Sequence, residues 1–190
     1  MSMGALKRTI YVTIKYSKQR YGVSKNGKSE TPIFDYQLQK NALIPIIART
    51  LGLNMLHNFA KARFANQKGS EPDLLMICCV DKTLVGWHGE RSGAIMRERC
   101  GGQGFLAINS FGEAIAGAHA ALTAEGDNRV LMVKVVKDML GIYMKNPETY
   151  YNGEFKKFTK LEELKNLSTL VTLFEMRHKH LLTSLITRMA

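Results

Sequence analysis

The sequence predicts an all-α protein with about four long helices and one further helix at the C-terminus. Three observations lead to this fold class. Apolar residues make up 45% of the chain, which is enough for a sizeable core. They recur mostly at helical spacing, and few stretches alternate with the period of two that is typical of strands. Breaks rich in Gly, Ser and Pro separate the periodic segments.

The N-terminal half of the chain is expected to supply two of the helices. Residues 5–18 place Leu6 and Ile10 on one apolar stripe, and the segment YGVSKNGKSETP that follows is predicted to be a loop. A longer helical pattern runs from about residue 33 to residue 66. Pro45 lies inside this pattern, so we expect it either to kink the helix or to mark its true start.

The C-terminal half continues the helical pattern. Residues 73–99 are predicted to be a helix, followed by the glycine-rich bend CGGQGFLAINSFG and the short small-residue segment GEAIAGAHAAL. Another helix is expected over residues 127–145. The linker NPETYYNGEFKKF then leads to a last amphipathic helix, acidic at its start and basic near its end, as the helix dipole favours. We therefore expect a bundle over residues 1–146 and a linker with the start of a further helical segment over 147–190.

Positive charge is concentrated at one end of the chain. The net charge is +11, and residues 1–70 carry twelve Lys or Arg against two acidic residues. Such a basic half fits nucleic acid or another polyanionic ligand, such as a nucleotide cofactor. A solvated basic face is an equally good interpretation from charge alone.

Composition also argues against several classes of protein. No apolar run reaches the about 18 residues of a membrane span, and the N-terminal residues lack the pattern of a secretory signal. Cys78, Cys79 and Cys100 form neither a disulfide framework nor a CxxC pair, so a reducing, intracellular compartment fits best. The five histidines show no ligand spacing, and no metal site is predicted.

The glycine-rich bend imitates a dinucleotide-binding motif. Gly102, Gly104 and Ala107 satisfy G-x-G-x-x-A, but that motif requires a strand before it. Here the preceding residues, MRERC, are predicted to end a helix. A helix C-cap and turn is the simplest interpretation, although glycines also allow the backbone to approach a bound ligand closely.

Glu125 is a second candidate for chemistry, because it is the only carboxylate in the small-residue run AGAHAALTAEG. A lone carboxylate in apolar surroundings can act as a base or an acid. However, Asp127 and Asn128 directly after it are ordinary helix-capping residues. From the local residues alone, a charge at a helix start is favoured over a catalytic base.

Four segments taken together resemble the C-terminal helical half of the acyl-CoA oxidases, flavoenzymes related to the acyl-CoA dehydrogenases. These segments are KYSKQRYG, IFDYQLQKNALIPIIA, RERCGGQGF and AEGDNRVLM, which occur in the order and spacing of that family. The resemblance covers roughly residues 5–146, and CGGxG and EGDN are its most specific pieces. It implies an up-down four-helix bundle of the acyl-CoA dehydrogenase C-terminal type.

The resemblance also implies a function. Acyl-CoA oxidases convert a fatty acyl-CoA to the trans-2-enoyl-CoA in fatty acid β-oxidation, with FAD as cofactor and hydrogen peroxide as the product of oxygen reduction. Glu125 matches the glutamate that removes the α-proton, and Gly126 matches a substrate-binding position that lets the backbone turn. The positions that match FAD contacts, partly across a subunit boundary, are Arg20, Gly101, Gly102 and Asp127.

The sequence departs from the family pattern at several points. Ala124 stands where Phe or Tyr is usual, the segment after Arg20 is shortened, and Gln103 replaces a His. The family also carries, ahead of this region, a helical domain and a β-domain that hold most of the flavin and thioester contacts. We therefore expect a portion of an oxidase that is inactive without those domains and works as a homodimer or with a chain that supplies them.

Two other interpretations remain open at the level of sequence. The chain could be a catalytically retired, oxidase-derived subunit that acts as a structural or interaction module, and Ala124 favours this. It could also be a basic helical protein that binds nucleic acid, which only the charge supports. A peroxisomal location follows from the family resemblance alone, since the chain shows no targeting signal.

Overall fold

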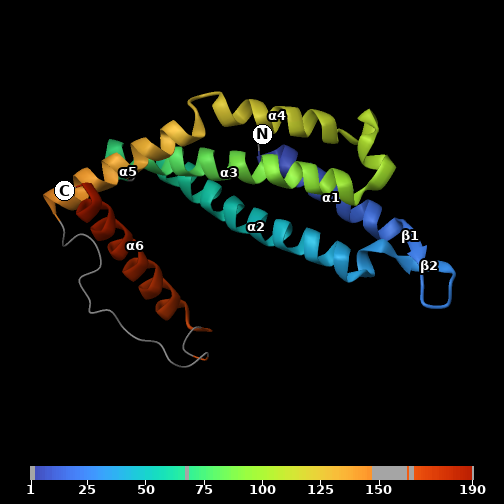
Figure 1. The fold of residues 1–190 in the computed structure, drawn as a ribbon. Coiled ribbons are helices and arrows are strands. Elements are labelled where there is room, and N and C mark those ends of the chain that lie inside the picture. The colour runs from blue at the N-terminus through green and yellow to red at the C-terminus, as the bar shows by residue number, and fades with distance from the viewer. Residues whose placement is uncertain (1–2, 67–68, 147–161, 163–164, 190) are drawn as a thin grey trace. The chain divides into compact units, whose positions relative to one another are not determined.

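The computed structural model describes residues 3–66, 69–146, 162 and 165–189. The chain forms two compact units, which divide between Val135 and Val136. The first unit holds four helices packed side by side, and the all-α bundle predicted from the sequence is confirmed (Figure 1). Its helices are α1 (Met3–Gln19), α2 (Gln37–Ala65), α3 (Glu71–Arg99) and α4 (Phe111–Thr123), followed by the start of α5 (Asn128–Lys145). Helix α3 contacts α1, α2 and α4 and is the centre of the bundle.

Helix α3 begins and ends at residues suited to those positions. The Ser70 hydroxyl accepts a hydrogen bond from the Asp73 N–H at 3.4 Å, and Pro72 lies in the first turn. The first turn is acidic, and the last turn holds Arg97 and Arg99. These charges complement the helix dipole and help to define both ends of α3.

Helix α2 starts earlier than Pro45. A short 3-10 turn, η1 (Ile33–Asp35), precedes it, and the helix then runs through Pro45. The prediction that Pro45 could mark the true start of the helix is therefore wrong. Pro45 and Asn41 are both exposed, so water can solvate the Asn41 carbonyl that loses its partner at the proline.

The segment predicted to be a loop contains a small hairpin instead. Strands β1 (Tyr21–Val23) and β2 (Ser29–Pro32) pair antiparallel, with Tyr21 opposite Pro32 and an irregularity after Gly22. Gly27 makes the reversal with φ +81°, a conformation that glycine adopts without strain. The Tyr36 hydroxyl donates to the Val23 carbonyl at 2.6 Å and ties the hairpin to the start of α2.

The core of the first unit lies between α1, α2, α3 and the start of α4. Phe111, the first residue of α4, is 1% exposed and packs into this core. The buried cluster consists of Met3, Leu6, Leu43, Ile46, Val85, Met96, Cys100 and Phe111. Burying a large apolar side chain contributes about 1.5–3 kcal/mol, so this cluster is what holds the helices that carry the site residues.

Helix α1 also buries a row of small hydroxyl side chains. The hydroxyls of Thr13 and Ser17 each donate to the carbonyl four residues earlier, at 2.7 Å. The Gln39 side-chain amide donates to the Ser17 hydroxyl at 2.8 Å and to the Arg99 carbonyl at 3.0 Å. One buried amide therefore joins α1, α2 and the end of α3 next to the glycine-rich bend.

A buried histidine links α2 to α3. The Thr50 hydroxyl donates to the Ile46 carbonyl at 2.8 Å, so it accepts from His88 Nε2 at 2.8 Å. His88 Nδ1 then accepts from the Ser92 hydroxyl at 3.1 Å. Burial lowers the pKa of His88, and the positive charge of Arg49 lowers it further, against a hydrogen bond to the Ile46 carbonyl that raises it. His88 is therefore neutral at physiological pH.

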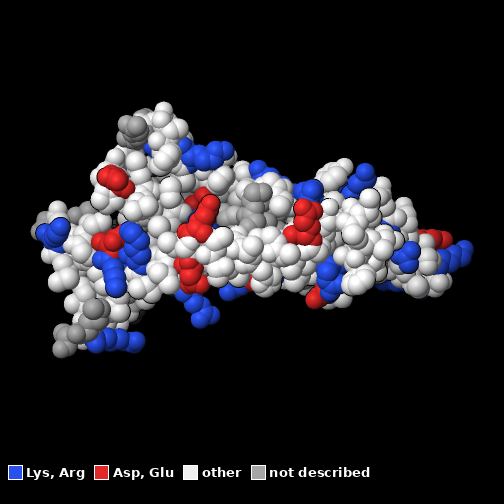
Figure 2. Space-filling view, turned by 90° about the horizontal axis from the view of Figure 1, so that it is seen from above, with Lys and Arg blue, Asp and Glu red and all other residues white. Residues whose placement is uncertain are grey.

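Charged side chains of both signs are spread over the face of the molecule that Figure 2 shows. In the view of Figure 2, Lys and Arg lie scattered among acidic and uncharged side chains and do not form one continuous basic patch.

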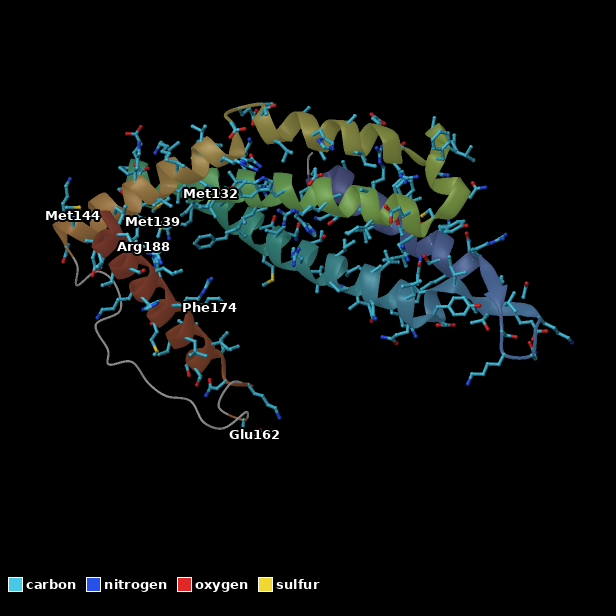
Figure 3. The ribbon with its side chains drawn as sticks, viewed as in Figure 1. Met132, Met139, Met144, Glu162, Phe174 and Arg188 are labelled. Carbon is cyan, nitrogen blue, oxygen red and sulfur yellow. The ribbon has the colours of Figure 1, made fainter. Side chains whose placement is uncertain are left out.

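The start of α5 is fixed to the bundle by Met132, labelled in Figure 3, whose sulfur accepts a hydrogen bond from the Thr83 hydroxyl at 3.2 Å.

The second unit holds the rest of α5 and helix α6 (Leu167–Met189). Met176 and Leu182 of α6 are buried, at 8% and 5% exposed. Most of the predicted linker lies outside the described residues, as does part of the predicted start of the last helix. The predicted boundary between residues 146 and 147 stays a prediction.

Candidate functional site

The structure gathers the predicted site residues in two places, at opposite ends of α4. Arg20 follows α1, and Gly101 and Gly102 follow α3, so these three lie at one end of the bundle. Residues 125–127 form the connection between α4 and α5 at the other end. Helix α4 has 13 residues, which corresponds to about 20 Å. Arg20, Gly101 and Gly102 therefore do not form one continuous site with Glu125 and Asp127 within this chain.

The glutamate turn, defined as residues 124–127, connects α4 to α5 through two unusual backbone conformations. Ala124 ends α4, and its N–H donates to the Ala120 carbonyl at 2.9 Å. Glu125 has φ +59° and Gly126 has φ +100°. A non-glycine residue in the left-handed region costs about 1–2 kcal/mol, whereas glycine adopts it readily. Glu125 is therefore strained at an exposed position, and Gly126 supplies the freedom that the turn requires.

A lysine from the middle of α3 holds this turn. Lys82 Nζ donates to the Gly126 carbonyl and to Asn128 Oδ1, both at 2.6 Å. The Asn128 side chain is 2% exposed, and its amide donates to the Thr83 carbonyl at 3.3 Å. A hydrogen bond to a charged group contributes about 1.5–3 kcal/mol, so even one of the two lysine bonds offsets the strain of Glu125.

Asp127 caps helix α5. Its Oδ1 accepts hydrogen bonds from the N–H groups of Arg129 and Val130, at 2.9 and 3.2 Å. This confirms the capping role that the local sequence indicated for Asp127. Its predicted contact with a flavin nucleotide stays a prediction.

Glu125 borders a pocket of about 420 Å³ with walls of small side chains. The pocket is lined by Lys82, Gly86, Gly117, Ala120, Ala121, Ala124 and Glu125. Gly86 also makes room for Asn128, because a Cβ there would lie 3.1 Å from the Asn128 side-chain nitrogen. A carboxylate at the edge of an open pocket is placed to exchange a proton with a ligand that enters it.

The arginine pocket, at the other end of α4, has a volume of about 470 Å³. Its lining residues are Tyr11, Val12, Lys15, Tyr16, Gln19, Arg20, Cys100, Gln103, Asn109 and Phe111. Two cations together with hydroxyl and amide groups suit a ligand that carries phosphate groups. Sequence reasoning identified Arg20 but missed Lys15 and Tyr11, although their spacing of four residues on one helix was a usable signal.

The two adjacent glycines leave the backbone beside this pocket open. A Cβ on Gly101, which has φ +54°, would meet only the Tyr16 hydroxyl at 3.8 Å, and one on Gly102 would meet nothing within 4 Å. A bound ligand could therefore approach this backbone closely. Gly104 differs, because a Cβ there would lie 2.2 Å from the Arg97 carbonyl oxygen. Gly104 is thus required for packing of the bend against α3.

The cysteine in the arginine pocket is not set up as a nucleophile. Cys100 is 1% exposed, and burial raises the pKa of its thiol, although a hydrogen bond with Thr13 opposes this. The thiol therefore stays protonated at neutral pH. Within the described ranges, no group of three or more His, Cys, Asp or Glu side chains could hold a metal ion.

Comparison with known families identifies the family to which the chain belongs. Residues 1–140 match the family model described as acyl-CoA oxidase, C-alpha1 domain. The chain belongs to the acyl-CoA oxidase family. Among curated oxidases it is 30% identical over 149 residues to acyl-coenzyme A oxidase 2, peroxisomal, of Arabidopsis thaliana. It is 25% identical over 153 residues to peroxisomal acyl-coenzyme A oxidase 3 of Homo sapiens. These alignments cover 75% and 72% of this chain.

Solved oxidase structures share the fold. Acyl-CoA oxidase 1 of Arabidopsis thaliana superposes with a TM-score of 0.73 at 22% identity, over 96% of this chain and 31% of that one. Acyl-CoA oxidase-1 of Caenorhabditis elegans, solved in complex with FAD and ATP, gives a TM-score of 0.74 at 17% identity. That match covers 95% of this chain and 30% of the nematode chain.

The chain spans only part of these oxidases. It covers 21% of the length of both the Arabidopsis and the human curated relatives. The matched part is the helical region that the resemblance predicted. Among the residues that the structure describes, no helix combines the length and the apolar character needed to cross a membrane.

Proposed function

We propose that this chain is the helical portion of an FAD-dependent acyl-CoA oxidase and that Glu125 is its catalytic base. The observation that carries the proposal is the glutamate turn of a family member, in which a strained, exposed Glu125 borders an open pocket. Strained residues persist only where the surrounding structure holds them, and they cluster at active sites. The substrate is a fatty acyl-CoA, which is converted to the trans-2-enoyl-CoA in fatty acid β-oxidation.

In this proposal the residues of the glutamate turn act on the α-carbon of the thioester. Glu125 accepts the α-proton on its carboxylate, and its backbone N–H donates to the thioester carbonyl, which makes that proton more acidic. Gly126 lets the backbone turn so that both groups of Glu125 face the substrate. FAD, when bound, supplies the acceptor for the β-hydride, and its electrons pass to molecular oxygen to give hydrogen peroxide.

The arginine pocket fits the phosphate-bearing part of FAD. Its two cations, Lys15 and Arg20, match pyrophosphate, and the open backbone at Gly101 and Gly102 permits close approach. Because the arginine pocket and Glu125 lie at opposite ends of α4, we propose a homodimer in which one chain's arginine pocket and the partner's glutamate turn serve the same flavin. An assembly in which another chain supplies the N-terminal helical domain and the β-domain of the family is the alternative proposal.

The compartment in this proposal is the peroxisome. It rests on two of the curated relatives, whose names state that location. Most of the flavin and thioester contacts are expected from the N-terminal helical domain and the β-domain of the family. We therefore propose that residues 1–190 alone are inactive.

A second candidate function is that of an interaction module without catalysis. The observation that favours it is the exposure of Phe105 and Ile108 in the bend after α3, at 83% and 87%. Ala124, in place of the usual aromatic residue, points the same way. The nucleic-acid alternative gains no support from the scattered charges in Figure 2.

The test of the proposed function combines the chain with the N-terminal helical domain and the β-domain that the family resemblance calls for. The assembly should hold FAD and produce hydrogen peroxide from an acyl-CoA. Glu125→Gln should retain the flavin and abolish turnover. Glu113→Gln, which changes an exposed carboxylate on α4, is the matched control and should keep full turnover. An assembly that binds FAD and turns over equally with Glu125→Gln would show that the base is another residue.

A further inference from the structure

We propose that Lys82 is a positioning residue for Glu125, because its ammonium group holds the glutamate turn against α3. This inference rests on the proposed function, in which Glu125 is the base. It assigns a role to a residue that the sequence motif does not contain, since Lys82 precedes Gly126 by 44 positions. Lys82 acts through the backbone and does not take part in the proton transfer itself.

Both bonds of the ammonium group are made to residues that closely follow Glu125 in the chain. Lys82 Nζ lies 2.6 Å from the Gly126 carbonyl oxygen and 2.6 Å from Asn128 Oδ1. The two acceptors flank Asp127, so one cation spans the end of the glutamate turn and the start of α5. Lys82 also lines the pocket that Glu125 borders.

Helix α3 provides a hydrogen-bond donor, a hydrogen-bond acceptor and the space for the Asn128 side chain. Lys82 donates to the Asn128 oxygen, and the Asn128 nitrogen donates to the carbonyl of Thr83, the next residue on α3. One turn further, Gly86 leaves the space that Asn128 fills, with only 3.1 Å between an added Cβ and the Asn128 nitrogen. The Asn128 side chain is 2% exposed and its bond to the Thr83 carbonyl is buried, whereas the bond from Lys82 to the Gly126 carbonyl is exposed.

Glu125 needs such an attachment because its own side chain lacks one. Within the described part of the chain, no hydrogen bond or ion pair holds the Glu125 carboxylate, which is exposed. Its direction therefore depends on the backbone of the turn, where Glu125 and Gly126 both have positive φ. A displacement of about 1 Å at a reacting group can lower a rate about 100-fold. Loss of the lysine bonds would release the turn and permit such a displacement.

The first measurement uses hydrogen exchange of the whole chain and needs neither flavin nor substrate. The N–H groups of Arg129 and Val130 donate to Asp127 and report on opening of the turn. Lys82→Met should speed exchange of these amides about 10- to 100-fold, as expected for the loss of charge-assisted hydrogen bonds. Amides in the middle of α2 should be unaffected. Lys61→Met, which changes an exposed lysine on α2, is the matched control.

The second measurement uses the assembled, flavin-loaded enzyme. Lys82→Met should lower kcat about 100-fold and leave KM for the acyl-CoA within about twofold, because the turn is displaced while the substrate contacts remain. A purely structural role would instead reduce the amount of folded enzyme and leave kcat per bound flavin unchanged. If Lys82→Met does not fold, Lys82→Gln keeps a hydrogen-bond donor and most of the stem and serves as the second variant.

The outcomes separate this inference from the proposed function. Suppose that Glu125→Gln is inactive, but Lys82→Met leaves either the exchange at Arg129 and Val130 or the kcat per bound flavin unchanged. That result would overturn the role of Lys82 and leave the role of Glu125 intact. Full turnover with Glu125→Gln would overturn the proposed function. Faster exchange together with a lower kcat supports both assignments.

Discussion

Replacing Gly126 by alanine is a direct test of the glutamate turn. Gly126 has φ +100°, and an added Cβ would lie 3.1, 3.3 and 3.4 Å from three atoms of the Leu131 side chain. The backbone term alone costs about 1–2 kcal/mol for an L-residue. Leu131 would have to shift by a few tenths of an ångström in addition. We therefore expect Gly126→Ala to lower the free energy of unfolding by at least about 1–2 kcal/mol.

The same substitution at Gly52 serves as the matched control. Gly52 lies in the middle of α2, where an added Cβ would meet nothing within 4 Å. Gly52→Ala should therefore raise the free energy of unfolding by about 0.5–1 kcal/mol. Urea denaturation of both variants, followed by circular dichroism, measures the two changes. For a chain of this size, 1 kcal/mol corresponds to a Tm shift of about 2–4 °C. Stabilisation by both alanines would refute the backbone conformation given to the turn.

Two further predictions concern stability. His88 is buried with a lowered pKa, so the unfolded chain binds a proton at about pH 6.5 that the folded chain does not. The free energy of unfolding of the wild type should exceed that of His88→Gln by its full amount above that pH, and this difference should shrink as the pH falls from 7 to 5. Urea denaturation measures the difference, and a value that does not change with pH would contradict the buried, neutral state of His88. Asp127→Ala should lower the free energy of unfolding by about 0.5–2 kcal/mol through loss of the α5 cap, whereas Asp127→Asn keeps an acceptor and should cost only a few tenths. Equal losses in the two Asp127 variants would argue against capping.

The helices could be predicted because their signals are local. Apolar residues at helical spacing predicted a helix over residues 73–99, which begins within two residues of the observed start of α3 at Glu71. The hairpin was missed because the Ser- and Lys-rich segment from Tyr21 to Pro32 does not alternate in polarity. The bond that anchors it, from Tyr36 to the Val23 carbonyl, joins residues 13 positions apart and is invisible to a periodicity argument.

Only part of the candidate site could be predicted, because contacts between residues far apart in the chain leave no local signal in the sequence. Glu125 and Arg20 were found through motifs that the acyl-CoA oxidase family shares. Lys82 gave no signal, because its partners Gly126 and Asn128 are 44 and 46 positions away and meet it only when α4 folds back along α3. The separation of Arg20 from Glu125 also became visible only in the fold. The sequence alone does not show that the two residues lie at opposite ends of α4.

The central claim is that Glu125 removes the α-proton of an acyl-CoA thioester. The most direct measurement is the anaerobic loss of flavin absorbance after an acyl-CoA is added to the assembled enzyme, wild type and Glu125→Gln, at equal flavin content. The wild type should bleach rapidly, and Glu125→Gln should stay yellow while it still binds the acyl-CoA. Bleaching of Glu125→Gln at the wild-type rate would contradict the account.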